Sequence, residues 1–88
     1  MANHQVAVFT FTLSGDRSIG PAALTDLWRR ASGTPDVGVE RKESHREGRP
    51  VYTLYASREL PDLHGVEMRL RNLLESAHLN ASVTPVYR

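Results

Sequence analysis

The longest run of strand-forming residues in the chain is Gln5–Leu13, QVAVFTFTL. Val, Phe and Thr favour an extended, pleated backbone over a helix. Because successive side chains of a strand point to opposite faces, two sets alternate along this run, and neither contains a charge. One set is Ala7, Phe9, Phe11 and Leu13, and the other is Val6, Val8, Thr10 and Thr12. A strand without charge on either face is expected in the middle of a sheet.

The size and composition of the chain limit what can be built around that strand. Its 88 residues are enough for one modest core, so we expect a single domain spanning 1–88. It is 40% hydrophobic and 24% charged, as ordinary globular domains are, and its net charge of +1 gives no electrostatic reason to expect nucleic acid as a partner. No run of about 18 apolar residues and no signal-peptide pattern is present, which predicts a soluble, cytoplasmic protein without a membrane partner.

Two amphipathic helices follow from apolar residues spaced three and four apart. The first is expected to begin at Pro21, with Ser18 or Gly20 as its cap, and to stop at Gly33. The second is expected to begin after Asp62 as N-cap and to stop near Asn80. The residues expected to face the core are Leu24, Leu27, Trp28 and Ala31 in the first helix, and Leu63, Val66, Leu70, Leu73, Leu74 and Ala77 in the second.

Three more strands are predicted. Residues 37–45 contain the charged run Glu40–Glu43, and charge of this kind is how natural sheets discourage pairing at an edge. A two-residue turn at Glu47-Gly48 would join them to the strand 49–57 in a hairpin, with Arg41 opposite Leu54. A last strand, 81–87, contains Pro85, which cannot donate to a ladder and therefore also predicts an edge.

The resulting order is β-α-β-β-α-β, with two apolar strands and two edge strands. We predict an α+β fold, a ferredoxin-like sandwich with the antiparallel sheet order 4-1-3-2 and both helices on one face. The other face would then be open and free of charge at its centre. We predict that two copies of the chain form a homodimer through this face, by stacking rather than by edge pairing. The predicted interface residues are Val6, Val8, Thr10, Thr12, Val51, Thr53 and Tyr55.

The loop before the first helix is the second candidate site. Its sequence SGDRSIG offers glycine, which lets a ligand approach the backbone, next to a helix N-terminus that suits a carboxylate. Asp16, Arg17 and a nearby glycine resemble the Gly-x-Asp-Arg-Pro-Gly loop of the ACT family of amino-acid-sensing domains, although Ser14 stands in place of the first Gly, Ser18 in place of Pro, and Gly20 comes one residue late. The resemblance implies a small regulatory domain that binds an effector at Ser14, Gly15, Asp16, Arg17 and Gly20.

Other readings remain open. No catalytic motif, metal-ligand spacing or cofactor fingerprint is present, so no catalytic residue, metal or cofactor is predicted. His4, His64 and His78 are expected at the surface, and His45, beside Glu43 and Glu47, offers the one acid/base candidate. The main hypothesis is a non-enzymatic regulatory or interaction module that binds a small ligand or a protein partner. The alternatives are a small dimeric α+β-barrel enzyme of isomerase or cyclase type, and an RNA-binding domain that uses Phe9, Phe11, Tyr52 and Tyr55.

Overall fold

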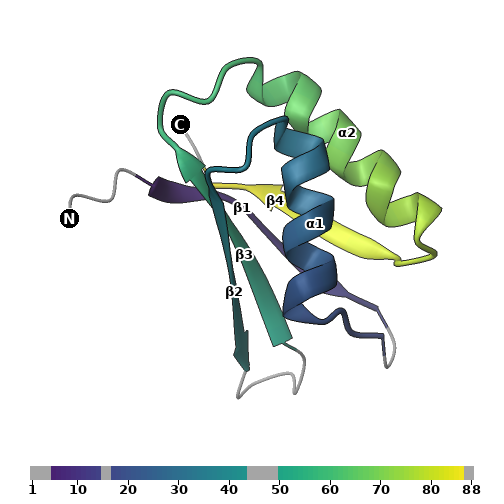
Figure 1. Ribbon diagram of the computed structural model, residues 1–88. Coiled ribbons are helices and arrows are strands. Elements are labelled where there is room, and N and C mark those ends of the chain that lie inside the picture. Colours follow the sequence, from purple (N-terminus) through teal and green to yellow (C-terminus); the bar gives the residue numbers. More distant parts are fainter. Residues whose placement is uncertain (1–4, 15–16, 44–49, 87–88) are drawn as a thin grey trace.

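One layer of helices covers one face of an antiparallel sheet in the computed structural model, which describes residues 5–14, 17–43 and 50–86 (Figure 1). The sheet is open and has the strand order β2-β3-β1-β4, which is 4-1-3-2 when read from the β4 edge. The two strands with charge or proline are therefore the edges, as predicted. In chain order the elements are β1 (Gln5–Leu13), α1 (Pro21–Ser32), β2 (Val37–Glu43), β3 (Pro50–Ser57), α2 (Leu63–Ser76) and β4 (Ala81–Pro85).

The helix ends follow the capping residues with one exception. Gly20 caps α1 in an extended conformation, and Gly33 ends it with a positive φ of 76° that glycine adopts without strain. At α2, the Asp62 side chain accepts a hydrogen bond from the Gly65 N–H at 3.2 Å, which confirms the predicted cap. The predicted stop at Asn80 is wrong, because α2 ends at Ser76 and the left-handed residue is His78.

The position of Asn80 explains that difference. Its carbonyl already accepts a hydrogen bond from the Ser14 N–H at 3.0 Å, so it belongs to the start of the sheet ladder. The turn must therefore be complete before it. His78 makes this turn at φ 61°, and the Leu79 N–H then returns to the Leu74 carbonyl at 2.9 Å.

The core lies between the sheet and the helices and is filled with large apolar side chains. Phe11 stacks on Tyr52 across the two central strands, with ring centroids 4.9 Å apart. Five of these side chains are at most 1% exposed, and Leu73 is partly buried against them. Each such side chain contributes about 1.5–3 kcal/mol when it is fully buried. The five are Phe9, Phe11, Trp28, Leu54 and Leu70.

The central strand β1 contains one extra residue. Ala7 lies opposite Tyr55, but Phe9 lies opposite the adjacent residue Leu54, so Val8 is unpaired with β3 and forms a β-bulge. A bulge interrupts the ladder and leaves a backbone group without its regular partner.

Trp28 of α1 makes two contacts beside the bulge. Its indole N–H donates to the Tyr55 carbonyl at 2.8 Å, beside the register shift. The same ring packs edge-on against Phe9, with centroids 5.9 Å apart and an interplanar angle of 87°. One buried side chain thus satisfies a backbone acceptor and fills the core at the same point.

The bulge corrects the predicted faces of β1. Val8 is 2% exposed and belongs to the core instead of the open face. Val6 lies directly opposite Ala56, which is 0% exposed beneath the helices, so Val6 also faces the helix side. Ala7, which the sequence placed in the core, instead shares the open face with Tyr55. Strict alternation fails here because it assumes that no residue is inserted.

The pairing of β2 with β3 differs from the prediction by two residues. Arg41 lies opposite Tyr52 instead of Leu54. The prediction assumed a two-residue turn at Glu47-Gly48, which lies outside the described residues together with positions 44 and 45, whereas six residues separate the last residue of β2 from the first of β3. Because a displacement by two residues leaves every side chain on its own face, the predicted faces of both strands are confirmed.

Candidate functional site

The open face of the sheet is the first candidate site, since neither helix covers it (Figure 1). Cross-strand pairs place Thr53, Thr10 and Thr84 in one row, from β3 through β1 to β4. Thr12 and Ser82 form the neighbouring pair, and Val51 of β3 lies on the same face. Five of the predicted interface residues therefore share this face: Thr10, Thr12, Val51, Thr53 and Tyr55. All five are partly exposed, and none is charged.

Val6 and Val8 do not belong to this face. The bulge turns both toward the helices, and Ala7 takes their place beside Tyr55. Sequence reasoning missed Ala7 because alternation without a bulge placed it in the core. It also missed Ser82 and Thr84, which only the β1–β4 register brings to the open face.

Among the residues that the structure describes, charge on the open face is confined to its β2 margin. Glu40 lies opposite Thr53, and Lys42 lies opposite Val51, so the two charges are neighbours on one edge strand. Arg41 and Glu43 alternate with them on the helix side, where they form an ion pair of 3.1 Å. Lys42 has no ion-pair partner among the described residues. The open face thus has a neutral centre and one negative and one positive group at the same edge.

Tyr55 is the one aromatic residue of this face in the part of the chain that is described. Its hydroxyl donates to Glu40 Oε1 at 2.8 Å. This hydrogen bond, followed by partial desolvation and the negative charge of Glu40, raises the pKa of Tyr55 above its ordinary value of 10.0. Gly38, directly opposite Tyr55, has no side chain, and a Cβ there would lie 2.9 Å from Gln5 Oε1. The tyrosine ring is therefore held toward Glu40 at the margin.

The outer edge of β4 is partly occupied. The Ser14 N–H donates to the Asn80 carbonyl, and the Val86 N–H donates to the Val8 carbonyl at 2.8 Å. The backbone N–H and C=O groups of even-numbered residues in this strand therefore point toward β1, and those of odd-numbered residues point outward. Among the outward residues, Pro85 has no N–H. The Val83 carbonyl already accepts a hydrogen bond at 3.2 Å from Arg71 Nη2. Proline and this arginine both oppose the addition of another strand at this edge.

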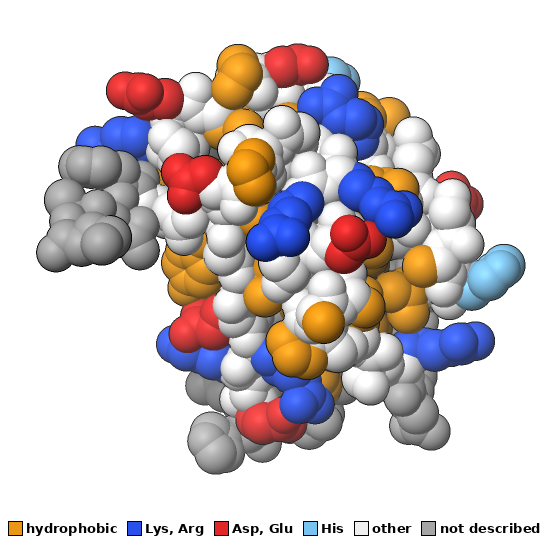
Figure 2. Space-filling model, in the orientation of Figure 1, with side chains coloured by type: hydrophobic (Ala, Val, Ile, Leu, Met, Phe, Trp, Pro, Cys, Tyr) orange, Lys and Arg blue, Asp and Glu red, His pale blue; other side chains and the backbone are white. Residues whose placement is uncertain are grey.

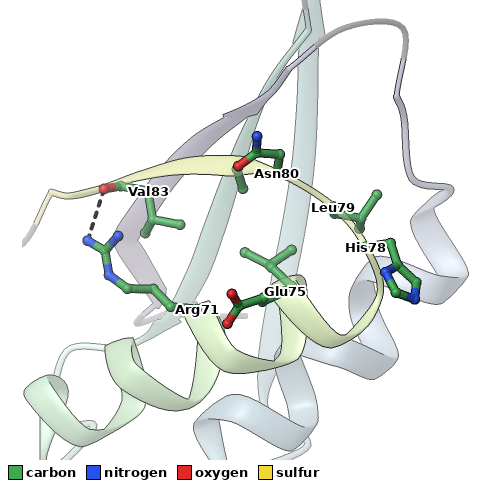
Figure 3. A pocket seen from close by; sticks show the side chains of 8 residues that line it. Arg71, Glu75, His78, Leu79, Asn80 and Val83 are labelled. Atoms are coloured by element: carbon green, nitrogen blue, oxygen red, sulfur yellow. Dashed lines mark hydrogen bonds between the residues drawn. The ribbon is translucent and has the colours of Figure 1, made fainter.

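Figure 3 shows the groove in which Arg71 reaches from α2 to Val83 of β4. The groove is open, has a volume of about 420 Å³ and is bordered by Glu75, His78 and Asn80. Arg71 is not available as a free cation, because the Glu67 carboxylate holds it at 2.6 Å. No local sequence pattern indicates this groove, since its residues come from α2, the following turn and β4.

The loop predicted to bind a ligand is described only in part. Gly15 and Asp16 lie outside the described residues, while Arg17 and Gly20 are exposed. The Ser14 N–H is already bonded to the sheet, so it is not free for a ligand. Tyr52 fixes the end of this loop, because its buried hydroxyl accepts from the Ile19 N–H at 3.2 Å.

The N-terminus of α1 offers backbone donors beside this loop. Gly20 provides no side-chain cap, Pro21 occupies the first helical position, and the first turn contains no acidic residue. A hollow of about 290 Å³ lies next to it, and its lining includes Ile19, Leu24 and Tyr52. The arrangement leaves free N–H groups where a small carboxylate would be stabilised by the helix dipole.

The remaining candidates have little support in the described structure. His64 and His78 are exposed, as expected, and His4, His45 and Glu47 lie outside the described residues. Within residues 5–14, 17–43 and 50–86, no group of three His, Asp or Glu side chains is placed to hold a metal ion. In the same residues, no helix is long and apolar enough to cross a membrane. Three of the four aromatic candidates for RNA stacking are at most 1% exposed: Phe9, Phe11 and Tyr52.

Comparison of the chain with protein-family models, curated proteins and solved structures finds no match.

Proposed function

We propose that this chain is a non-enzymatic interaction module with a ferredoxin-like fold, and that it works as a homodimer whose copies stack through the open faces of their sheets. The observation that carries the proposal is the neutral centre of the open face, where threonines surround Val51 and Tyr55. A sheet face that stays in solvent normally carries charge across its middle. The outer surface of the helix layer does so, as Figure 2 shows from that side, with Arg29 and Glu75 among its exposed residues.

Two further observations support a binding role over the alternatives. The space between sheet and helices is filled with apolar side chains such as Trp28 and Leu70, whereas an enzyme of the α+β-barrel type needs polar groups in that space. An RNA-binding face of this topology stacks bases on aromatic residues of the central strands. Here the open face offers only Tyr55 among the described aromatics.

Sedimentation equilibrium of the purified chain from 1 to 200 µM tests the proposal. We expect a dimer with a dissociation constant in the micromolar range, because the described part of the open face consists mainly of threonines and offers only one of the aromatic side chains that dominate tight interfaces. Thr10→Lys combined with Thr53→Glu should give a folded monomer. Asn72→Lys, on the exposed surface of α2, is the matched control and should leave the dimer intact. A monomeric wild type across this range would refute the proposal.

A second candidate function is the binding of a small carboxylate, such as a free amino acid, at the N-terminus of α1, as the resemblance to the ACT family implies. The uncapped first turn beside the hollow favours it. Gly20 has an ordinary φ of −73°, and nothing lies within 4 Å of a Cβ placed there, so Gly20→Asp fits. Its carboxylate would occupy the free N–H groups.

Thermal unfolding with millimolar free amino acids distinguishes a binding site from a plain turn. If the site binds, one of them raises the Tm of the wild type by several degrees and that of Gly20→Asp by much less. Gly20→Ala, which adds a Cβ but no acceptor, should behave as the wild type does. If no amino acid shifts the wild type, this candidate is excluded.

A further inference from the structure

We infer that the two-fold axis of the stacked dimer runs across the strands, so that Glu40 of each copy faces Lys42 of the other. This inference rests on the proposed dimer and adds its geometry. It is carried by the position of the two charges, which lie two residues apart on the same face of β2. Such a pair is self-complementary under a two-fold axis that passes between its members.

The axis has two simple orientations when sheets stack with their strands roughly aligned. An axis parallel to the strands places β2 of one copy over β4 of the other. Glu40 and Lys42 would then face Thr84 and Ser82, the residues at the same levels of the sheet. Each charge would lose water without gaining a partner of opposite sign, which is costly.

An axis perpendicular to the strands gives a better match. It places β2 over β2 with opposite direction, and the row that contains Glu40 over the row that contains Lys42. Both Glu–Lys contacts then form at the β2 end of the axis, one on each side of it, near the rim. In the middle, Thr10 faces Thr12 of the second copy, and Thr53 faces Val51. Hydroxyl groups meet hydroxyl groups or a methyl-bearing side chain, and no like charges meet.

The intramolecular partners of the charges agree with this geometry. Lys42 is exposed and has no ion-pair partner among the described residues, so it is available to a second copy. Tyr55 donates to only one carboxylate oxygen of Glu40, and a carboxylate accepts further hydrogen bonds through its remaining lone pairs. The tyrosine also restrains Glu40, which reduces the entropy lost when an ion pair forms.

Charge reversal in two separate chains tests the orientation. Glu40→Lys gives a chain with two positive groups at this margin, and Lys42→Glu gives one with two negative groups. We expect each variant to dimerise at least about tenfold more weakly than the wild type, since each homodimer contains two like-charge contacts. An equimolar mixture should form heterodimers with an affinity within about threefold of the wild type, because every contact is again between opposite charges.

The control uses the neighbouring charges of the same strand. Arg41→Glu and Glu43→Arg reverse charges with the same spacing on the opposite face of β2. They should leave a stacked dimer unchanged, whereas they would disturb a dimer formed by pairing β2 edge to edge. Glu40→Gln keeps a side-chain acceptor for Tyr55 and should weaken the dimer less than Glu40→Lys does. Circular dichroism of each chain confirms that it is folded.

The outcomes separate this inference from the proposed function. If the wild type is a dimer and the two reversals neither weaken it nor favour heterodimers, the orientation is wrong while the dimer stands. If the Arg41 and Glu43 reversals weaken the dimer as much as the Glu40 and Lys42 reversals do, the copies associate by pairing β2 edges instead of stacking, and the orientation is refuted as well. A wild type that stays monomeric at 200 µM refutes the proposed function and the inference together. Weak homodimers that combine into a strong heterodimer, with silent controls, establish the orientation.

Discussion

The two faces of the sheet are built from the same strands but have opposite physical character. On the helix side, Phe9, Tyr52 and Leu54 are 0% exposed and pack against aromatic and aliphatic side chains. On the open side, their direct neighbours Thr10 and Thr53 are partly exposed and neither charged nor strongly apolar. The first face must exclude water for the chain to fold at all. The second can lose water or keep it, so substitutions there should change association and leave folding nearly unchanged.

The largest expected effect is a difference in stability between lysine substitutions at two adjacent positions of β1, one on each face of the sheet. Val8→Lys places an unpaired charge at a position that is 2% exposed, so we expect the free energy of unfolding to fall by about 3 kcal/mol or more. Ala7→Lys places the same charge on the open face and should cost less than about 1 kcal/mol. Urea denaturation measures both. The opposite ranking would mean that β1 alternates regularly and has no bulge.

Trp28→Phe tests how the helix side tolerates the bulge. The smaller ring leaves the Tyr55 carbonyl without its indole donor and opens a small cavity, so we expect a loss of about 2 kcal/mol. Phe9→Leu also reduces the volume of a core side chain but removes no hydrogen bond, and it should cost less. If the two variants are equally destabilised in urea, the indole hydrogen bond contributes nothing measurable.

Arg71→Met asks whether association uses the open face or the β4 edge. The variant keeps an apolar stem but loses the bonds to Glu67 and Val83, and we expect a loss of about 0.5 kcal/mol, as for exposed pairs. Sedimentation should give the dimer affinity of the wild type, since stacking does not use this edge. Dimerisation that strengthens when the Val83 carbonyl is released would instead identify β4 as the contact.

The smallest effect concerns the alkaline limit of stability. Because Glu40 raises the pKa of Tyr55 in the folded state, the folded chain holds this proton at a pH where the unfolded chain has released it. The contribution is complete below the unfolded pKa and is lost as the pH rises through the folded pKa. Urea midpoints at pH 9 and pH 11 should therefore fall more for the wild type than for Tyr55→Phe. Equal falls would show that Tyr55 titrates normally.

Much of the fold follows from the sequence because its signals are local and agree with one another. Gly33 and Asp62 define helix ends through backbone conformation and a side-chain acceptor, and Pro85 defines an edge through its missing N–H. The β2–β3 register was wrong because it was derived from an assumed turn. The predicted face of each side chain in β2 and β3 was still correct, because a register error of two residues does not exchange the faces of a strand.

The sequence alone does not predict the bulge, and for that reason it does not predict which β1 residues lie on the open face. Ala7, Val8 and Phe9 are all apolar, so either alternation of faces looks acceptable at these positions. What decides between them is the register with β3 and the donor supplied by Trp28, which are both long-range features. For the same reason the open-face residues of β4 were missed, whereas those of β3, where alternation holds, were found.

Val8 is the extra residue of β1 relative to β3, as if one residue had been inserted into a regular strand. If this residue were deleted, Ala7 would still lie opposite Tyr55 and Phe9 opposite Leu54, and the ladder would become regular. Removal of Phe9 would also keep the faces of β1, because Val8 and Phe9 both point into the core, but it would take away the larger buried side chain. The chain is thus expected to tolerate the loss of this one codon better than its replacement by a charged residue, which makes position 8 the natural place for length variation within the central strand.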